Sequence, residues 1–259
     1  MKNLFGYLLV ALFGIAAVKF VMAAPKKEAR VTAVIKDVRV IGSNAAPKAA
    51  ALNDSVVEGN AIRTGGDSRA ELTFTDATLT RIGANTVFTF GEGAKQFDLA
   101  SGALLLVVPK SAGTTRVNIG AATAAVSGFT ALFEHNASIN KLVILEGRGD
   151  VSFKNIPGPC PLESGQMMVW PTRPTRCPEV RTVDVSKVMK SAKLVTLFNK
   201  LPAWSLGPIQ LVIENQQTSP PPGGLTDPTN IDAVSQNQPN QPIPPPHIIK
   251  PPGSPPGSF

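Results

Sequence analysis

The chain has 259 residues, a formal net charge of +7 and 24 prolines, but only two histidines and two cysteines. A chain of this length accommodates one large domain or two small ones. The scattered lysines lack the interleaved aromatic residues of a nucleic-acid-binding surface, and the few histidines and cysteines leave little for a catalytic or metal centre.

Residues 1–23 have the pattern of a secretory signal. Lys2 precedes an apolar stretch at residues 4–18, and a small-residue cleavage site follows before Ala24. Lys19 ends the apolar stretch short of the ~20 residues that a membrane-spanning helix needs. We therefore expect export to the periplasm or the medium of a bacterium, with no stable membrane span after cleavage. An uncleaved membrane anchor is the alternative.

Short alternating segments separated by turn residues fill positions 58–90. Residues 69–74 alternate polar and apolar side chains, which places Ala70, Leu72 and Phe74 on one buried face of a strand. Gly, Asp and Asn residues at 65–67, 76–77 and 83–85 mark turns. The pattern predicts an all-β domain and is compatible with a sandwich, a barrel or a β-solenoid. Its charged residues are expected to form turns, face solvent or pair across strands rather than build a site: Arg63, Asp67, Arg69, Glu71 and Arg81.

A series of motifs in this stretch has a recognisable order. They are Gly59, Ile62-Arg63-Thr64-Gly65, Asp67-Ser68-Arg69-Ala70-Glu71-Leu72, Asp76 and Leu79-Thr80-Arg81-Ile82-Gly83. In this order they resemble the FecR-type domain, the periplasmic domain of the FecR iron-dicitrate regulator family. The resemblance implies a domain of short strands, β-solenoid-like or sandwich-like, here in a stand-alone exported form over residues 24–178.

Further sequence motifs extend the resemblance to the FecR-type domain, from about Ala29 to Trp170. They are an opening strand at residues 34–40, Leu99-Ala100-Ser101-Gly102, Leu145-Glu146-Gly147 and Ser164-Gly165-Gln166. One element departs from the family. Where the family commonly has Arg-Gly-Thr, the chain has Ser127-Gly128-Phe129, so a role tied to that arginine does not carry over.

The two cysteines, Cys160 and Cys177, lie in one proline-rich stretch. In an exported chain we expect them to form a disulfide around a strand at residues 166–170, worth ~3 kcal/mol by the loop-entropy estimate. A redox-active pair usually has the spacing C-x-x-C, and a metal site needs more than two ligands. A redox-active pair and a metal site are therefore both less favoured than a structural disulfide.

Residues 179–214 are expected to add one helix and one strand that pack on the β-domain. The helix is predicted at residues 186–201, with Ser186 as N-cap and Pro202 as the stop. Its apolar stripe favours packing on the sheet over lying on a membrane, and it is a candidate cap for the open end of a solenoid. Residues 209–213 are predicted to form a strand. Residues 215–259 are rich in Pro, Gln, Asn and Ser and are expected to be a disordered tail, either a spacer or a recognition motif.

No catalytic, cofactor-binding or metal-binding residues are expected. His135 is predicted to be an exposed histidine at a strand end, and Ser127-Gly128 lacks the G-x-S-x-G frame of a nucleophile elbow. Gly91-Glu92-Gly93 and Arg148-Gly149-Asp150 are predicted to be hairpin turns rather than a phosphate cradle and an adhesion motif. We therefore expect a protein that is not an enzyme and needs no cofactor.

Two functions agree with these expectations. The first is a non-enzymatic binding or scaffold module of the bacterial cell envelope, whose partner is an envelope protein or a cell-wall glycan and whose binding face the sequence does not identify. The second is a soluble sensor partner in FecR-like, iron-responsive cell-surface signalling. Only three residues precede the apolar segment, which favours the first over a regulator with its own cytoplasmic domain.

Overall fold

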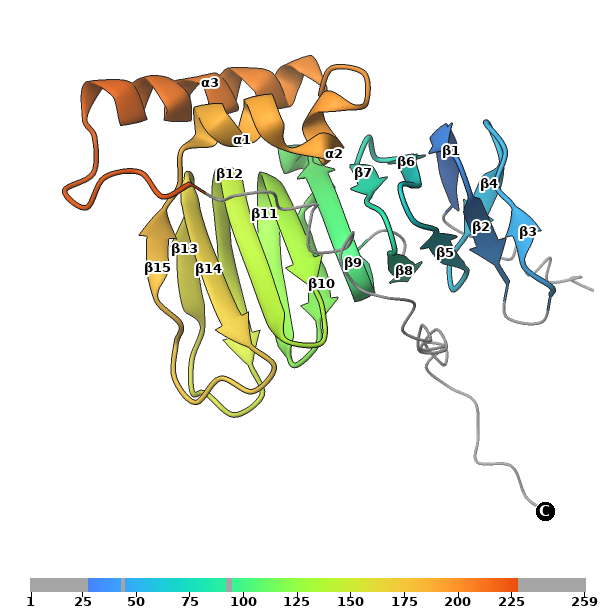
Figure 1. Ribbon diagram of the computed structural model, residues 1–259, viewed down its shortest axis with the longest axis horizontal. Coiled ribbons are helices and arrows are strands. Elements are labelled where there is room, and N and C mark those ends of the chain that lie inside the picture. Colours follow the sequence, from blue (N-terminus) through green and yellow to red (C-terminus); the bar gives the residue numbers. More distant parts are fainter. Residues whose placement is uncertain (1–27, 43–44, 92–94, 228–259) are drawn as a thin grey trace, which may run out of the picture.

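The computed structural model describes residues 28–42, 45–91 and 95–227. Within these residues, 15 strands form one hydrogen-bonded network, and three α-helices follow the last strand (Figure 1). The domain is thus all-β, as predicted. The expected signal at residues 1–23, the turn at Gly91-Glu92-Gly93 beyond its first residue, and residues 228–259 of the expected tail lie outside the described residues. The first part of that tail is ordered, which corrects the prediction, because residues 215–218 end the last helix and Thr226 pairs with Val183.

The strands form two sheets that face each other, and three long strands belong to both. Sheet I has the order β4 (Ser55–Val57), β1 (Glu28–Ile35), β6 (Arg69–Phe74), β7 (Leu79–Ile82), β9 (Gln96–Val108), β11 (Ala122–His135), β12 (Ile139–Phe153), β14 (Gln166–Pro171) and β15 (Val180–Thr182). Sheet II has the order β3 (Lys48–Ala49), β2 (Val38–Ile41), β5 (Ala61–Thr64), β8 (Val87–Gly91), β9, β10 (Thr114–Ile119), β11, β12 and β13 (Cys160–Glu163). The β9–β10 pair is parallel and the other pairs are antiparallel.

The long strands cross from one sheet to the other at glycines. Gly102 in β9, Gly128 in β11 and Gly147 in β12 have φ values of 96°, 56° and 91°, which residues with a Cβ rarely adopt. A Cβ on Gly147 would lie 2.6 Å from the carbonyl oxygen of Gly128, so the corners of neighbouring strands are stacked tightly. Gly102 and Gly147 belong to motifs that resemble the FecR pattern, and Gly128 lies in the element that departs from it. These three glycines are therefore the corners of the sandwich.

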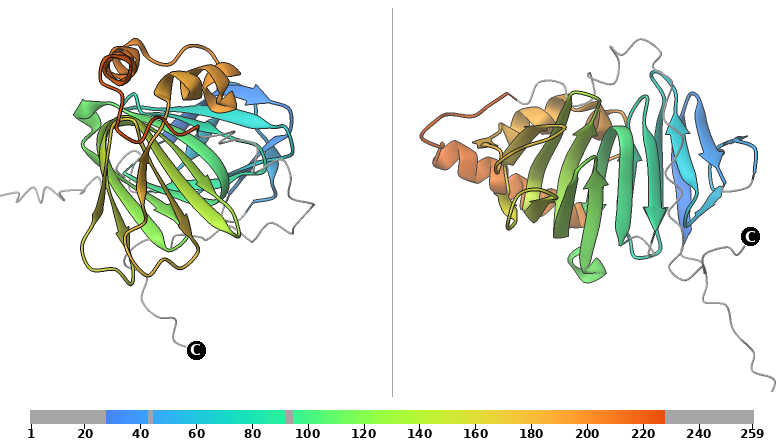
Figure 2. Two further views of the ribbon diagram at one scale, coloured as in Figure 1. Left: turned by 60° about the vertical axis from the view of Figure 1, so that its left-hand side comes forward. Right: turned by 90° about the horizontal axis from the view of Figure 1, so that it is seen from below.

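The main core fills the space between the two sheets. The alternation predicted for residues 69–74 is confirmed, since Ala70, Leu72 and Phe74 all lie in this core. Phe74 packs edge-on against Phe90 and Phe97, with ring centroids 4.8 and 5.4 Å apart. Figure 2 shows the strands stacked along the long axis of the molecule.

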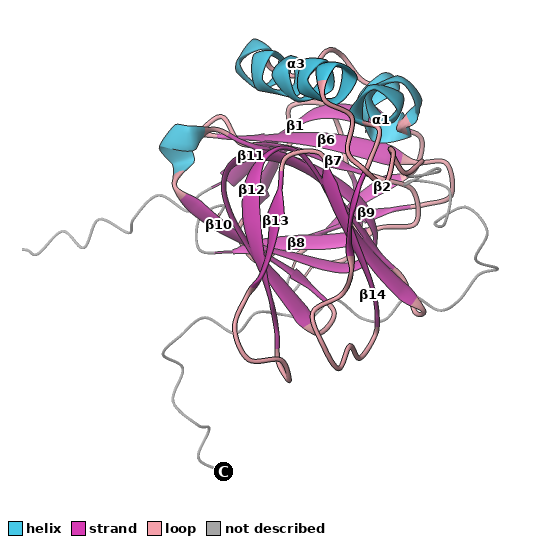
Figure 3. Ribbon diagram, turned by 90° about the vertical axis from the view of Figure 1, so that its left-hand side faces the viewer, coloured by secondary structure: helices cyan, strands magenta, loops and turns pink. Residues whose placement is uncertain are grey.

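Three helices cover the outer face of sheet I: α1 (Val185–Ser191), α2 (Lys193–Thr196) and α3 (Ala203–Thr218). Leu105 of β9, Val143 of β12 and Met167 of β14 point outward and form a second apolar cluster with Val188 and Ile209 of the helices. Figure 3 shows the helices together on one side of the sandwich. They cover the side of sheet I, so the expectation of a cap on the open end is wrong. A short 3-10 helix, η1 (Lys110–Ala112), joins β9 to β10.

The single helix predicted at residues 186–201 is wrong in extent. Asp184, not Ser186, is the N-cap and accepts a hydrogen bond from the Lys187 amide, and the helix is interrupted at Ala192, whose ψ of 119° is extended. The strand predicted at residues 209–213 is also wrong, because these residues lie within α3. The apolar run at 209–213 favours a strand locally, but helical packing on the exposed side of sheet I prevails.

Two further expectations need correction. The opening strand predicted at residues 34–40 is divided between β1 and β2 by a turn at Lys36, whose φ is 59°. The turn predicted at Arg148-Gly149-Asp150 is absent, because these residues lie inside the unbroken strand β12. Gly149 is buried against Val126, where a Cβ would approach within 2.6 Å. The tripeptide is therefore not displayed on a loop, as an adhesion motif would be.

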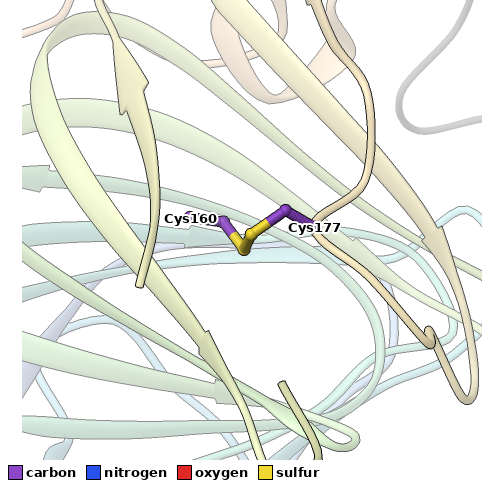
Figure 4. Close-up of a disulfide and its surroundings, with 2 residues drawn as sticks. All are labelled: Cys160 and Cys177. Carbon is purple, nitrogen blue, oxygen red and sulfur yellow. A yellow bond between two sulfur atoms is a disulfide. The ribbon is translucent and has the colours of Figure 1, made fainter. Parts of the chain in front are cut away.

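The predicted disulfide is present between Cys160 and Cys177, whose Cα atoms are 5.7 Å apart. Figure 4 shows the bond joining the start of β13 to the segment that follows β14. It closes a loop that contains the strand predicted at residues 166–170, which the structure places in β14. Among the described residues, no helix has the length and apolar character needed to cross a membrane.

Candidate functional site

The outer face of sheet II is a polar surface of the sandwich, and we call it the open face. It consists of the outward side chains of β9 to β13 in this sheet, whereas the helices bury the corresponding side of sheet I. Seen from below, the strands lie in front of the helices (Figure 2, right). The outward residues are mostly short and polar: Gln96, Asp98, Thr114, Arg116, Asn118, Thr123, Ala125, Ser127, Arg148, Asp150, Ser152 and Glu163.

A hydrogen-bonded row runs across the open face at the end next to the turn between β10 and β11. Asp98, Asn118, Thr123 and Ser152 stand opposite one another on β9, β10, β11 and β12. The Asn118 side-chain amide donates to Asp98 Oδ1 at 2.7 Å, and the Thr123 hydroxyl donates to Asn118 Oδ1 at 2.9 Å. These bonds fix the amide and the carboxylate in one orientation, so the row is rigid before any partner arrives.

One carboxylate oxygen of this row has no hydrogen-bond partner among the residues that the structure describes. Asp98 Oδ2 is shielded from solvent and receives no hydrogen bond. A buried acceptor without a donor costs about 1–3 kcal/mol, which a donor supplied by a partner or by water would recover. The row therefore combines fixed geometry with unused hydrogen-bonding capacity.

Two further rows follow the first in succession, away from the turn between β10 and β11, and carry charges of both signs. Arg116, Ala125 and Asp150 stand opposite one another, and so do Ser127, Arg148 and Glu163. The small side chains of β11 thus lie between longer ones on β10 and β12. Ser127 occupies the position at which the FecR pattern commonly has arginine, so the face lacks a cation there. With two arginines against three carboxylates, the open face suits a polar partner rather than a strongly charged one.

The charged residues of the FecR motifs have a different role. Arg63 and Asp67 are exposed, as predicted. Arg69, Glu71 and Arg81 are buried and do not face solvent, but the expected pairing across strands is confirmed for Glu71 and Arg81. Arg69 and Glu71 belong to β6, and Arg81 belongs to β7. None of the three lies on the open face.

Arg81 joins sheet I to the helices. It donates from Nε to Glu71 Oε2 at 2.8 Å, and its other nitrogens donate to the carbonyl oxygens of Leu194 at 3.0 Å and Asn199 at 2.6 Å. The carbonyls at the end of a helix lack partners within the helix, so a cation there is favourable. Its guanidinium also lies 4.9 Å from the centre of the Phe198 ring. Burial lowers the pKa of Arg81, and the hydrogen bond to Glu71 opposes that shift.

Two further titratable residues lie near strand ends and corners. His135 is half-buried rather than exposed, and its Nδ1 lies 2.6 Å from Asn140 Oδ1. Burial lowers the pKa of His135. Glu146, which precedes the corner at Gly147, accepts a hydrogen bond from Thr130 at 2.9 Å, and burial raises its pKa. Neither residue faces a second catalytic group.

Within the part of the chain that the structure describes, no three His, Cys, Asp or Glu side chains lie close enough together to hold a metal ion. Ser127 and Asp150 lie in β11 and β12 and not in a tight turn between a strand and a helix. The arrangement of the open face supports recognition by hydrogen bonding and ion pairing. The expectation that the chain is not an enzyme stays a prediction.

Comparisons with known proteins agree with the motif pattern. Residues 60–148 match the family described as "FecR protein", so the resemblance seen in the sequence is confirmed. No match was found among the curated proteins. Similar solved structures include two that are each described as a "putative anti-sigma factor" from Parabacteroides distasonis, at 2.50 and 1.65 Å resolution.

The likeness to these two structures is distant. The first has 12% sequence identity and a TM-score of 0.42 over 51% of this chain and 64% of that chain. The second has 16% identity and a TM-score of 0.43 over 60% of this chain and 75% of that chain. The chain thus spans less than two thirds of the first structure's length.

Proposed function

We propose that this chain, which carries a FecR domain at residues 60–148, is an exported, non-enzymatic binding module of the bacterial cell envelope that holds its partner on the open face. The observation that carries the proposal is the contrast between the two sides of the sandwich. Helices seal the outer face of sheet I with an apolar cluster, whereas the outer face of sheet II presents fixed polar rows.

The chemistry of the open face defines the class of partner. Asn118, Arg116 and Arg148 offer donors, while Asp98 and Asp150 offer acceptors, in rows set by strand spacing. A partner with hydroxyl and amide groups in a regular repeat, either an extended peptide or a glycan, satisfies both kinds of group. Because the rows are already held by hydrogen bonds, binding costs little ordering of side chains.

A role in signalling is the second candidate, and the FecR match favours it. In this role the chain is a soluble sensor partner that receives an iron-responsive signal, and the open face is then the surface that receives it. The two candidates differ in the partner and not in the surface.

Capture from envelope extract tests the proposal. The chain without residues 1–23, the expected exported form, is immobilised, and material retained after washing is analysed separately for protein and for wall glycan. Recovery of an outer-membrane transporter supports the signalling role, and recovery of glycan or a structural envelope protein supports the scaffold role. If neither a protein nor a glycan is retained, both the signalling role and the scaffold role are contradicted. Turnover of a substrate would contradict the non-enzymatic assignment.

A further inference from the structure

The helices carry large apolar side chains that no other part of the described structure covers. Leu197 is 51% exposed at the end of α2, and Trp204 and Leu211 of α3 are 42% and 60% exposed. These three residues are among only seven large hydrophobic side chains that are exposed within the described residues. Figure 1 shows that the helices that carry them form an outer layer of the molecule.

Lysines belong to the same helical layer as these apolar residues. Lys187, Lys190 and Lys200 are exposed and Lys193 is half-buried, whereas Glu214 is the single acidic residue from 185 to 218. Lys187 pairs with Asp227, and the other three lysines form no ion pair within the described residues. The helical layer is therefore cationic as well as apolar.

We propose that the helical layer docks peripherally on an anionic phospholipid surface. Protruding Trp and Leu side chains insert between headgroups, and neighbouring lysines are attracted to anionic lipid, which is the usual chemistry of interfacial helices. A helical layer that exposes large apolar side chains together with unpaired lysines has the chemistry that an anionic bilayer surface attracts. The peptide alternative would use the shallow groove between α1 and α3, whose floor includes Met189, Leu206 and Ile209.

This docking goes beyond the proposed function and is compatible with it. The helices lie on sheet I, and the open face belongs to sheet II on the opposite side of the core. A chain that rests on a membrane through its helices thus presents the open face away from that membrane, where a second envelope component can reach it. Either proposal can fail without the other, because the surfaces share no residue.

Tryptophan fluorescence of the full chain tests the docking directly. Of the two tryptophans, Trp170 is 1% exposed, so Trp204 reports contact with lipid. Vesicles of phosphatidylglycerol mixed with phosphatidylcholine carrying brominated acyl chains are expected to shift the emission to the blue and to quench it. Added salt is expected to reverse both effects, and pure phosphatidylcholine is expected to produce neither.

Matched variants separate the helical layer from other causes of binding. Removal of the three unpaired lysines in K190Q/K193Q/K200Q is expected to lower partitioning about a hundredfold, since each lysine near the surface contributes roughly fivefold. K36Q/K48Q/K154Q removes the same charge elsewhere and is expected to bind like the wild type. Leu211→Ser is expected to reduce the quenching. Leu52→Ser is the control, because Leu52 is also exposed but lies remote from the helices, and it is expected to leave the quenching unchanged.

Three results would overturn the docking: no quenching on anionic vesicles, equal loss in both triple-lysine variants, or quenching that K190Q/K193Q/K200Q retains. The last result would mean that the apolar stretch at residues 4–18, and not the helical layer, brings the chain to the vesicle.

Discussion

Glu71 of β6 and Arg81 of β7 stand directly opposite each other across the two strands, and a 2.8 Å hydrogen bond from Arg81 Nε to Glu71 Oε2 joins them. The Arg81 side chain has no exposed surface, and that of Glu71 is 11% exposed. Because Arg81 also binds the carbonyl oxygens of Leu194 and Asn199, the pair attaches the helices to the segment that matches the FecR family.

Arg81→Met is expected to destabilise the protein by about 3–5 kcal/mol, because it leaves Glu71 and several helix-end carbonyls without their partner. Lys36→Gln is the matched control. Its ion pair with Asp67 has both side chains 62% exposed, and such pairs contribute about 0–1 kcal/mol. Urea unfolding measures both variants, and limited proteolysis between residues 185 and 218 reports release of the helices. An Arg81→Met variant as stable as Lys36→Gln would show that the pair does not anchor them.

Gly147→Ala tests the corner between the two sheets. Its φ of 91° strains any residue with a Cβ, and the new Cβ would also lie 2.6 Å from the Gly128 carbonyl oxygen. Gly158→Ala is the control, because its φ of 78° imposes the same strain while nothing lies within 4 Å. Both variants should lose about 1–2 kcal/mol to backbone strain, and Gly147→Ala should lose roughly 1–3 kcal/mol more. Equal urea midpoints would mean that the corner is not tightly packed.

The disulfide between Cys160 and Cys177 should contribute ~3 kcal/mol to the free energy of unfolding. Substitution of both cysteines by serine removes it without leaving a free thiol, and urea unfolding gives the difference. Titration of thiols in the oxidised, denatured wild type is expected to find none. Two reactive thiols in that sample would contradict the structure.

Glu146→Gln should change how stability depends on pH. Burial raises the pKa of Glu146 above its ordinary value of 4.5, so the folded state binds more protons than the unfolded state between the two values. Ionisation of Glu146 therefore lowers stability as pH rises, and the loss is complete above the folded-state pKa. Glutamine still accepts the bond from Thr130 but does not ionise.

The difference in unfolding free energy between the Glu146→Gln variant and the wild type should thus grow in favour of the variant from about pH 4 to about pH 8. Denaturant unfolding across this range measures it. A difference that stays constant with pH, or that favours the wild type at the higher pH, would contradict the direction of the shift.

Local signals in the sequence predicted the sheet well and the buried charges poorly. The turn at Asp76 and Ala77 fixes the hairpin, so the pairing of Glu71 with Arg81 follows from counting outward from the turn. Their burial does not follow, because it depends on helices that begin more than a hundred residues later. A charged residue in a strand is expected to face solvent unless such a distant element covers it.

The other errors have the same origin. Residues 209–213 favour a strand by composition and become helical because Ile209 packs on sheet I. The tripeptide at Arg148 continues a strand because Gly147 places the corner one residue earlier. The polar row of the open face requires the parallel pairing of β9 with β10, which brings Asn118 beside Asp98. The pairing of two parallel strands depends on the path of the segment that connects them, and a local sequence pattern does not show that path.

The most direct test of the proposed function compares capture of the envelope partner by the wild type and by Thr123→Arg. Thr123 lies in the centre of the polar row, so a long cationic side chain there would cover the row without entering the core. Thr75→Arg adds the same side chain at an exposed position after β6 and serves as the control. We expect Thr123→Arg to fold and to lose at least about tenfold in capture, equivalent to ~1.4 kcal/mol, while Thr75→Arg captures like the wild type. Undiminished capture by a folded Thr123→Arg variant would contradict the assignment of the open face as the binding surface.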